Sequence, residues 1–218
     1  MVRCRKQARS RLIPIRPPVL PVYWRMRTHS STSLQPLCGY LAETCMVQRF
    51  SLEAVSLQQL EPKLQENSEA RELVGRALNV LSQNVAQLMS LLETIHDSEH
   101  ELKAASVRLS GMFVGSVCKR RSRDAPAMLR DDYALINLAA MNYIMLHTKG
   151  LATRHSSVAS LALGHLQHLA AISQDIVRLM PSVVIHELKG VIDSLPTEAE
   201  RTAYSNTQSA WRNSASAA

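Results

Sequence analysis

Apolar residues recur every three or four positions over most of the chain after residue 68. This spacing is the repeat of one face of an α-helix. The first run includes Leu73, Ala77, Val80, Leu81, Val85, Leu88, Leu91, Leu92 and Ile95, and it resumes at Leu102, Ala105, Leu109 and Met112. Similar runs cover residues 129–146 and 158–188. With seven Gly and 4% aromatic residues, the composition also favours helices over β-sheets.

Helices with long apolar faces must bury those faces against one another, and short connections make neighbouring helices antiparallel. We therefore predict an all-α protein, an elongated antiparallel helical bundle. Its stripes are wide enough for a partner subunit to cover part of them. No apolar run approaches the roughly 20 residues that cross a bilayer, so we expect no membrane span.

Charge divides the chain into two unequal parts. Residues 1–50 contain nine Lys or Arg and one acid, Glu43, whereas residues 51–218 contain sixteen Lys or Arg against seventeen Asp or Glu. The net charge of +7 is thus the sum of +8 and −1. Prolines at 14, 17, 18 and 21 interrupt any helix in the first part. The pattern predicts a disordered basic head over residues 1–50, a helical bundle over 51–195, and a short helix with a flexible tail over 196–218.

The head has three interpretations. It resembles an organelle transit segment because it is rich in Arg and Ser and poor in acids. It also suits a basic arm that binds an anionic partner. The third is a disordered extension, which would include the case in which the true translation start is Met46 and the preceding residues are translated from upstream of it. Deletion of residues 1–45 is predicted to leave the melt nearly unchanged. We expect a cytoplasmic protein, or one of an organelle matrix if the head is a transit segment. Cysteine spacing offers no zinc site, and Cys118 is the one cysteine after residue 50.

Capping signals place the helix boundaries. Ser68 is a candidate cap, and from there we favour one long helix to about residue 118. A break at Asp97–Ser98 is the alternative, since Ser98 and Glu101 fit a capping box. Ala125 and Pro126 suit the start of the next helix, which Gly150 is expected to end. Ser156 or Ser157 should then open a helix that continues past Pro181 to Gly190.

Residues 88–99 with 102–105 form one notable stretch, and residues 131–136 with 174–179 form a second. Both stretches resemble the small bacterial ferritin-like proteins of uncharacterised, stress-associated type. The resemblance covers about a third of residues 51–195. It implies a bundle that is ferritin-like in part and that binds iron through carboxylates and histidines from four helices.

The metal candidates are Glu93, His96 and Glu99, in which Glu93-x-x-His96 supplies one pair of the kind that such a site uses. The sequence departs from the family pattern elsewhere. No Asp or Glu lies between Tyr133 and Gly150, and Gln174 stands where the family has a histidine. We therefore predict weak or absent iron binding, carried by Glu93 and His96 if it occurs.

Other polar clusters have plainer interpretations. His165 and His168 lie three residues apart, so both can face one side of a helix; we favour hydrogen-bonded or exposed histidines over a metal pair. The basic run Lys119–Arg123 has no aromatic platform or groove-entering motif, so we favour a solvated loop and expect no nucleic acid partner.

No nucleophile elbow or glycine-rich phosphate loop occurs, so we expect no enzyme and no cofactor. The favoured function is that of a non-catalytic helical bundle acting through protein–protein contact or self-association. Its partner is expected to be a second copy, in a homodimer or other homo-oligomer, or a helical protein. The alternative is an iron-binding ferritin-like protein with an incomplete carboxylate and histidine site.

Overall fold

A computed structural model describes residues 34–95, 98–117 and 124–216, and every regular element in them is helical. The all-α helical-bundle prediction is therefore confirmed. The elements are the short 3-10 helix η1 (Gln35–Leu37), α1 (Cys38–Gln58), α2 (Pro62–Gln65), α3 (Ser68–Leu92), α4 (Ser98–Val117), α5 (Ala125–Ala152), α6 (Ser156–Lys189) and α7 (Ala199–Ser216).

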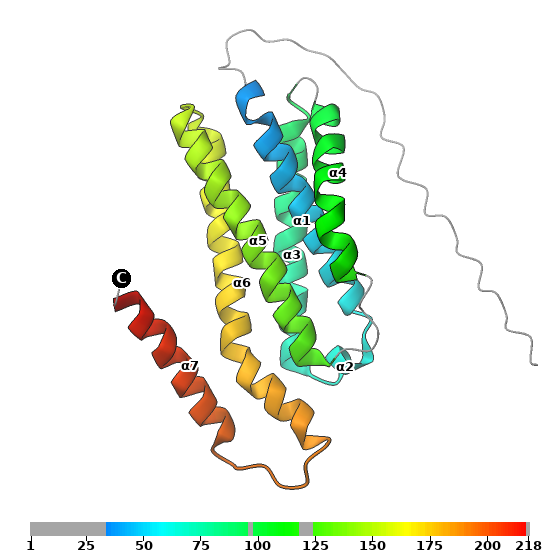
Figure 1. Cartoon of the computed structure of the whole chain (residues 1–218), viewed down its shortest axis with the longest axis vertical. Helices are drawn as coiled ribbons and strands as arrows, with labels where there is room; N and C mark the ends of the chain where they lie inside the picture. The colour runs from blue at the N-terminus through cyan, green and yellow to red at the C-terminus, as the bar shows by residue number, and fades with distance from the viewer. Residues whose placement is uncertain (1–33, 96–97, 118–123, 217–218) are drawn as a thin grey trace, which may run out of the picture. The chain divides into compact units, whose positions relative to one another are not determined.

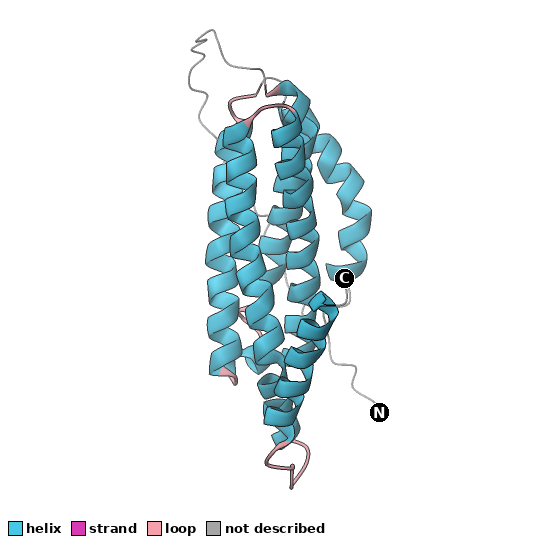
Figure 2. Cartoon of the chain, turned by 90° about the vertical axis from the view of Figure 1, so that its left-hand side faces the viewer, coloured by secondary structure: helices cyan, strands magenta, loops and turns pink. Residues whose placement is uncertain are grey.

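Four helices close a ring around the core. Helix α1 packs on α3, α3 on α6, α6 on α5, and α5 on α1. Helix α4 contacts α1 from outside the ring, and α7 contacts α6. Helices that follow one another run in opposite directions, whereas α1 and α4 run the same way (Figure 1). Seen from the side, the axes of most of these helices lie roughly parallel to one another, whichever way each chain segment runs (Figure 2). Helix α1 therefore contacts three long helices.

The first long helix corrects the predicted head. Helix α1 begins at Cys38, and Leu37, Leu41, Ala42 and Cys45 are almost fully buried. The boundary at residue 50 thus falls inside a core helix, and residues 34–50 belong to the bundle. The prediction missed α1 because its buried face includes polar residues, so its sequence shows no clear apolar stripe. Deletion of residues 1–45 would remove several of these buried side chains, so we now expect it to lower the stability rather than leave the melt unchanged. Residues 1–33 lie outside the described structure.

The single long helix predicted over residues 68–118 is also wrong. Helix α3 ends at Leu92, a turn follows through Ile95, and α4 begins at Ser98. The alternative break near Asp97–Ser98 is the one that occurs. The cap at the start of α3 is Asn67 rather than Ser68, because the Asn67 side chain accepts a hydrogen bond from the Ala70 N–H at 2.9 Å.

The connection between α5 and α6 shows why Gly150 does not end its helix. The His155 N–H bonds the Gly150 carbonyl at 2.8 Å, and the Arg154 N–H bonds the Leu151 carbonyl at 3.1 Å. This is a Schellman motif, and Arg154 takes the left-handed position at φ 61°, where glycine is usual. Gly150 lies one turn earlier, where an added Cβ would meet the Ala159 backbone nitrogen at 2.9 Å. Its role is to let α5 and α6 approach closely.

The bounds of α6 match the prediction better than the structure of the C-terminal tail does. Helix α6 begins at Ser156, continues through Pro181 and is capped at Gly190. The tail was expected to hold only a short helix, but α7 extends from Ala199 to Ser216. None of its described side chains, over residues 199–211, is buried.

Candidate functional site

The two metal candidates that the structure describes, Glu93 and Glu99, lie at the adjoining ends of α3 and α4 rather than inside the bundle. Glu93 caps the C-terminus of α3, and Glu99 lies in the first turn of α4; both are exposed. His96 lies outside the described residues. A ferritin-like centre needs ligands from facing helices that project into the core. Neither glutamate is placed that way, and no group of three potential metal ligands occurs among the described residues.

The core instead contains a chain of uncharged polar side chains across three helices. Tyr143 of α5 lies 3.0 Å from His165 Nδ1 on α6, and His165 Nε2 lies 2.8 Å from the Gln87 carbonyl oxygen on α3. The carbonyl oxygen accepts, so Nε2 carries the proton and Nδ1 accepts from the tyrosine hydroxyl. The two rings also meet edge to face, with centroids 5.1 Å apart. His168, expected on the same side as His165, is exposed.

Burial keeps the ionisable groups of this layer uncharged at neutral pH. It lowers the pKa of His165 to about 4, with a smaller contribution from the nearby His168. It raises the pKa of the Cys45 thiol on α1 to about 11, a direction that Arg49 opposes. It also raises the pKa of Tyr143, with a smaller contribution from Cys45. A thiol with a raised pKa is a poor nucleophile, so these groups favour a structural role over acid–base or nucleophilic chemistry.

Two further buried amides have atoms without a hydrogen-bond partner among the described residues. Gln48 of α1 is fully buried, and neither its Nε2 nor its Oε1 has a partner among the described residues. Asn84 of α3 is 1% exposed, and its Nδ2 is likewise unpaired there. A buried amide without a hydrogen bond costs about 1–3 kcal/mol. The Nε2 of Gln58 donates to buried Asp132 at 2.7 Å, while its Oε1 has no partner among the described residues. Sequence reasoning missed these polar residues because polar side chains normally indicate a solvent-facing position.

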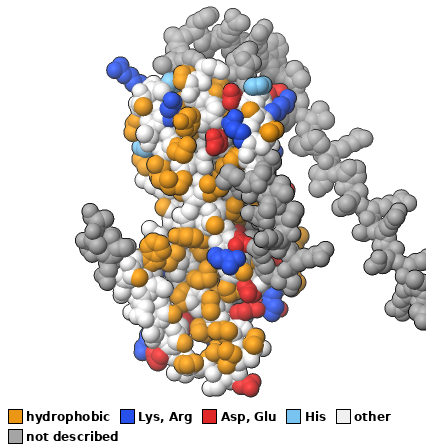
Figure 3. Space-filling model, in the orientation of Figure 1, with side chains coloured by type: hydrophobic (Ala, Val, Ile, Leu, Met, Phe, Trp, Pro, Cys, Tyr) orange, Lys and Arg blue, Asp and Glu red, His pale blue; other side chains and the backbone are white. Residues whose placement is uncertain are grey.

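The surface of α5 shows the opposite arrangement. Large apolar side chains are exposed at one position of α5 and at the positions three, four and ten residues after it. These spacings place them on one face of the helix over nearly three turns. This face, which we call the α5 stripe, consists of Met141 (55% exposed), Ile144, Met145 and Leu151 (59%). On the face of the molecule in Figure 3, hydrophobic side chains gather over the upper part of α5. Leu163 of α6 is exposed as well.

The stripe lies in an unusually uncharged part of the chain. Residues 133–174 contain two residues of the Asp, Glu, Lys and Arg group, Lys149 and Arg154, although such residues make up 20% of the chain. Both occur near the α5–α6 turn. The Lys149 ammonium lies 5.5 Å from the ring centroid of Tyr40, on α1, and therefore points away from the stripe. A large exposed apolar face usually marks an interaction surface.

The remaining candidates fall outside what the structure describes. This applies to the basic run Lys119–Arg123, to Cys118 and to the basic residues before position 34. Among the described helices, none combines the length and apolar content that a bilayer crossing requires. Comparisons of the chain with models of known families, with curated proteins and with solved structures find no match.

Proposed function

We propose that this protein is a non-catalytic helical bundle that acts by self-association through the α5 stripe. The observation that carries the proposal is the set of exposed apolar side chains from Met141 to Leu151, in a stretch whose one charged residue, Lys149, has its ammonium over the ring of Tyr40 on α1. Their burial would contribute about 25 cal/mol for each Å² of apolar surface removed from water.

A second copy of the chain is the occupant that the surface favours. In a two-fold dimer each patch meets its own copy, so a charge near the axis faces the same charge on the partner. A stripe without charges avoids that repulsion. Two of its members are methionines, whose flexible side chains adapt to an opposing surface. A helical partner protein with a matching apolar face would use the same stripe.

Sedimentation velocity tests this proposal. The unaltered chain is expected to sediment as a homodimer at micromolar concentration, and Met145→Lys is expected to shift it to a monomer. Leu60→Lys is the matched control, because Leu60 is 83% exposed but lies between α1 and α2. A strict monomer at high micromolar concentration that binds no apolar dye would contradict the proposal. A dimer that survives Met145→Lys would show that another surface forms the interface.

The iron-binding alternative rests on the resemblance to ferritin-like proteins and on Glu93, His96 and Glu99. Elemental analysis of protein purified without chelator tests it directly. We expect little or no iron. About two irons per chain, abolished by either Glu93→Ala or His96→Ala, would replace the non-catalytic proposal with the ferritin-like one.

A further inference from the structure

Two of the four side chains of the α5 stripe are methionines, and both are open to solvent. Met141 is 55% exposed and Met145 is 43% exposed. The other methionines whose side chains the structure describes are buried or half-buried: Met46, Met89, Met128 and Met180. Among these described side chains, the stripe thus holds the thioether sulfurs that a dissolved reagent reaches most easily.

A solvent-exposed thioether reacts with peroxide. The sulfur forms a bond to one oxygen atom of hydrogen peroxide, the O–O bond breaks, and water leaves. The sulfur gives up two electrons, which reduce the peroxide. The product, methionine sulfoxide, carries a polar oxygen where the side chain was apolar, and such a change disrupts interfaces rich in methionine.

The surroundings of the two sulfurs offer little to pair with such an oxygen. Met141 and Met145 are four residues apart, so their Cβ atoms lie about 5–6 Å from each other. Exposed Thr148 follows three residues after Met145 on the same face, and its hydroxyl donates to the Ile144 carbonyl at 2.8 Å. The Lys149 ammonium lies over the Tyr40 ring. The hydroxyl hydrogen and the ammonium are thus already engaged elsewhere.

The symmetry of the proposed dimer would multiply the effect of oxidation. In a two-fold interface each chain contributes the same patch. Two sulfoxides on each chain would therefore place four polar oxygens in one interface. Burying a polar atom without a hydrogen bond weakens association by about tenfold or more.

We propose that Met141 and Met145 form a peroxide-sensitive modification site, at which oxidation to the sulfoxide dissociates the protein and reduction restores association. The inference rests on the proposed self-association through the α5 stripe, and it describes how that association is regulated. Peroxide reacts with the free chain, because association covers both sulfurs. The oxidised chain then no longer returns to the dimer.

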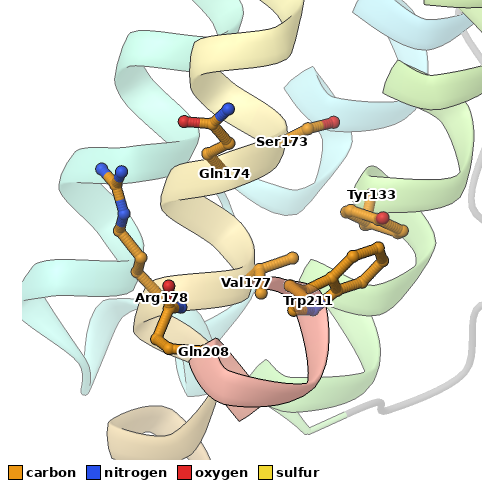
Figure 4. Close-up of a pocket in the computed structure, with 7 residues that line it drawn as sticks. All are labelled: Tyr133, Ser173, Gln174, Val177, Arg178, Gln208 and Trp211. Carbon is orange, nitrogen blue, oxygen red and sulfur yellow. The ribbon is translucent and has the colours of Figure 1, made fainter. Parts of the chain in front are cut away.

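The far end of α7 provides a reporter of the fold that peroxide should leave unchanged. A groove of about 480 Å³ lies where α7 passes over α5 and α6, and no methionine is among the described residues that line it. The rings of Tyr133 and Trp211 lie beside each other there (Figure 4). The chain has two tryptophans, so in the full chain carrying Trp24→Phe the emission reports on Trp211 alone. An unchanged emission spectrum distinguishes dissociation from unfolding.

Peptide mass spectrometry and sedimentation velocity, after treatment of the full chain with millimolar hydrogen peroxide, test the inference. Met141 and Met145 should oxidise at least about tenfold faster than buried Met46 and Met128. The dimer should become at least about a hundredfold weaker, with Trp211 emission unchanged. Methionine sulfoxide reductases should restore it.

Matched variants assign the effect to the stripe. The double variant Met141→Leu and Met145→Leu keeps apolar side chains of similar volume without sulfur, so peroxide should not change whatever share of dimer it forms. The double variant Met89→Leu and Met180→Leu makes the same change at half-buried positions, and it should respond to peroxide like the unaltered chain.

The outcomes distinguish this inference from the proposed function. A dimer that survives full oxidation of Met141 and Met145 overturns the inference alone. The same holds if Met128 oxidises as fast as they do, or if peroxide dissociates the Met141→Leu and Met145→Leu variant equally. A chain that is monomeric before peroxide is added overturns the proposed self-association, and this inference with it.

Discussion

Helices α1 and α7, at the two ends of the described chain, use their residues in opposite ways. Of the 21 residues of α1, twelve are buried, including Thr44, Gln48 and Ser51. None of the described side chains of α7 is buried. Helix α1 is enclosed by α3, α4 and α5, whereas α7 contacts α6 alone among the long helices in appreciable extent. A clean amphipathic pattern therefore marks a helix with one buried face, and it is absent from a helix buried on several sides.

Truncation should give the largest contrast between these helices. Deletion of residues 1–45 removes Leu37, Leu41 and Cys45 from the core and should unfold the bundle. Each large buried side chain contributes about 1.5–3 kcal/mol, against a typical total stability of about 5–15 kcal/mol. Deletion of residues 199–218 should cost less than about 1 kcal/mol.

Thermal melts followed by circular dichroism measure both truncations. Deletion of residues 1–33, which removes nothing from α1, is the control and should leave the melt nearly unchanged. A cooperative melt that survives the 1–45 deletion would contradict the placement of α1 in the core.

Single substitutions test the same comparison with less disturbance. Leu41→Ala on α1 should lower the free energy of unfolding by about 2–5 kcal/mol, because Leu41 is fully buried and its truncation leaves a cavity. Tyr204→Ala on α7 should change it by less than about 0.5 kcal/mol, since Tyr204 is exposed. Urea denaturation measures both; equal losses would show that α7 packs as tightly as α1.

Lowering the pH should reduce the stability of the protein through His165, which lies in the core that α1 helps to enclose. The pKa of His165 is lowered from 6.5 to about 4 in the folded protein. Its unfolded form therefore takes up a proton first as the pH falls. The stability that depends on neutral His165 is fully present above about pH 6.5 and is lost toward pH 4, by about 2 kcal/mol between pH 7 and pH 5.

Urea unfolding of His165→Gln at both pH values isolates this effect from that of the carboxylates. The variant should lose about 2 kcal/mol less than the unaltered chain between pH 7 and pH 5. His186→Gln, at an exposed histidine further along α6, is the matched control and should keep the full pH dependence. An unchanged pH dependence in His165→Gln would contradict the prediction.

The smallest expected effect is a gain in stability. Gln48→Met replaces the buried, unpaired amide of α1 by an apolar side chain of similar length, and it should raise the free energy of unfolding by about 1–2 kcal/mol. Gln208→Met, at a half-buried position of the otherwise exposed α7, should change it little. A loss of stability in Gln48→Met would indicate that the amide has a hydrogen-bond partner in solution, such as an enclosed water molecule.

The sequence predicted those parts of the fold whose signals are local. Helical periodicity identified the class and the course of α5 and α6, and Asp124 accepts a hydrogen bond from the Ala127 N–H where the Ala125-Pro126 start was expected. It did not predict α1, because buried Gln48 and Ser51 look like surface residues. The end of α5 was misplaced because Arg154, not Gly150, adopts the left-handed conformation.

The candidate sites were harder still to predict from the sequence. The His165 contacts with Tyr143 and Gln87 join residues separated by 22 and 78 positions, which no local pattern reveals. The exposure of the α5 stripe depends equally on which helices surround α5. Gln174 drew attention only as a departure from the ferritin-like pattern, yet it lines the groove under α7.

The enclosed position of α1 also has a consequence for biosynthesis. Its last residue is 58, whereas α5, one of the helices that cover it, is complete only at residue 152. At about 5–20 residues per second, the ribosome needs roughly 5–20 s to add the 94 residues between them. During that interval the apolar surfaces of α1 lack their final neighbours. A nascent chain of this kind should therefore depend on chaperones, or on provisional pairing of α1 with α3, more than one whose first helix lies at the edge of the bundle.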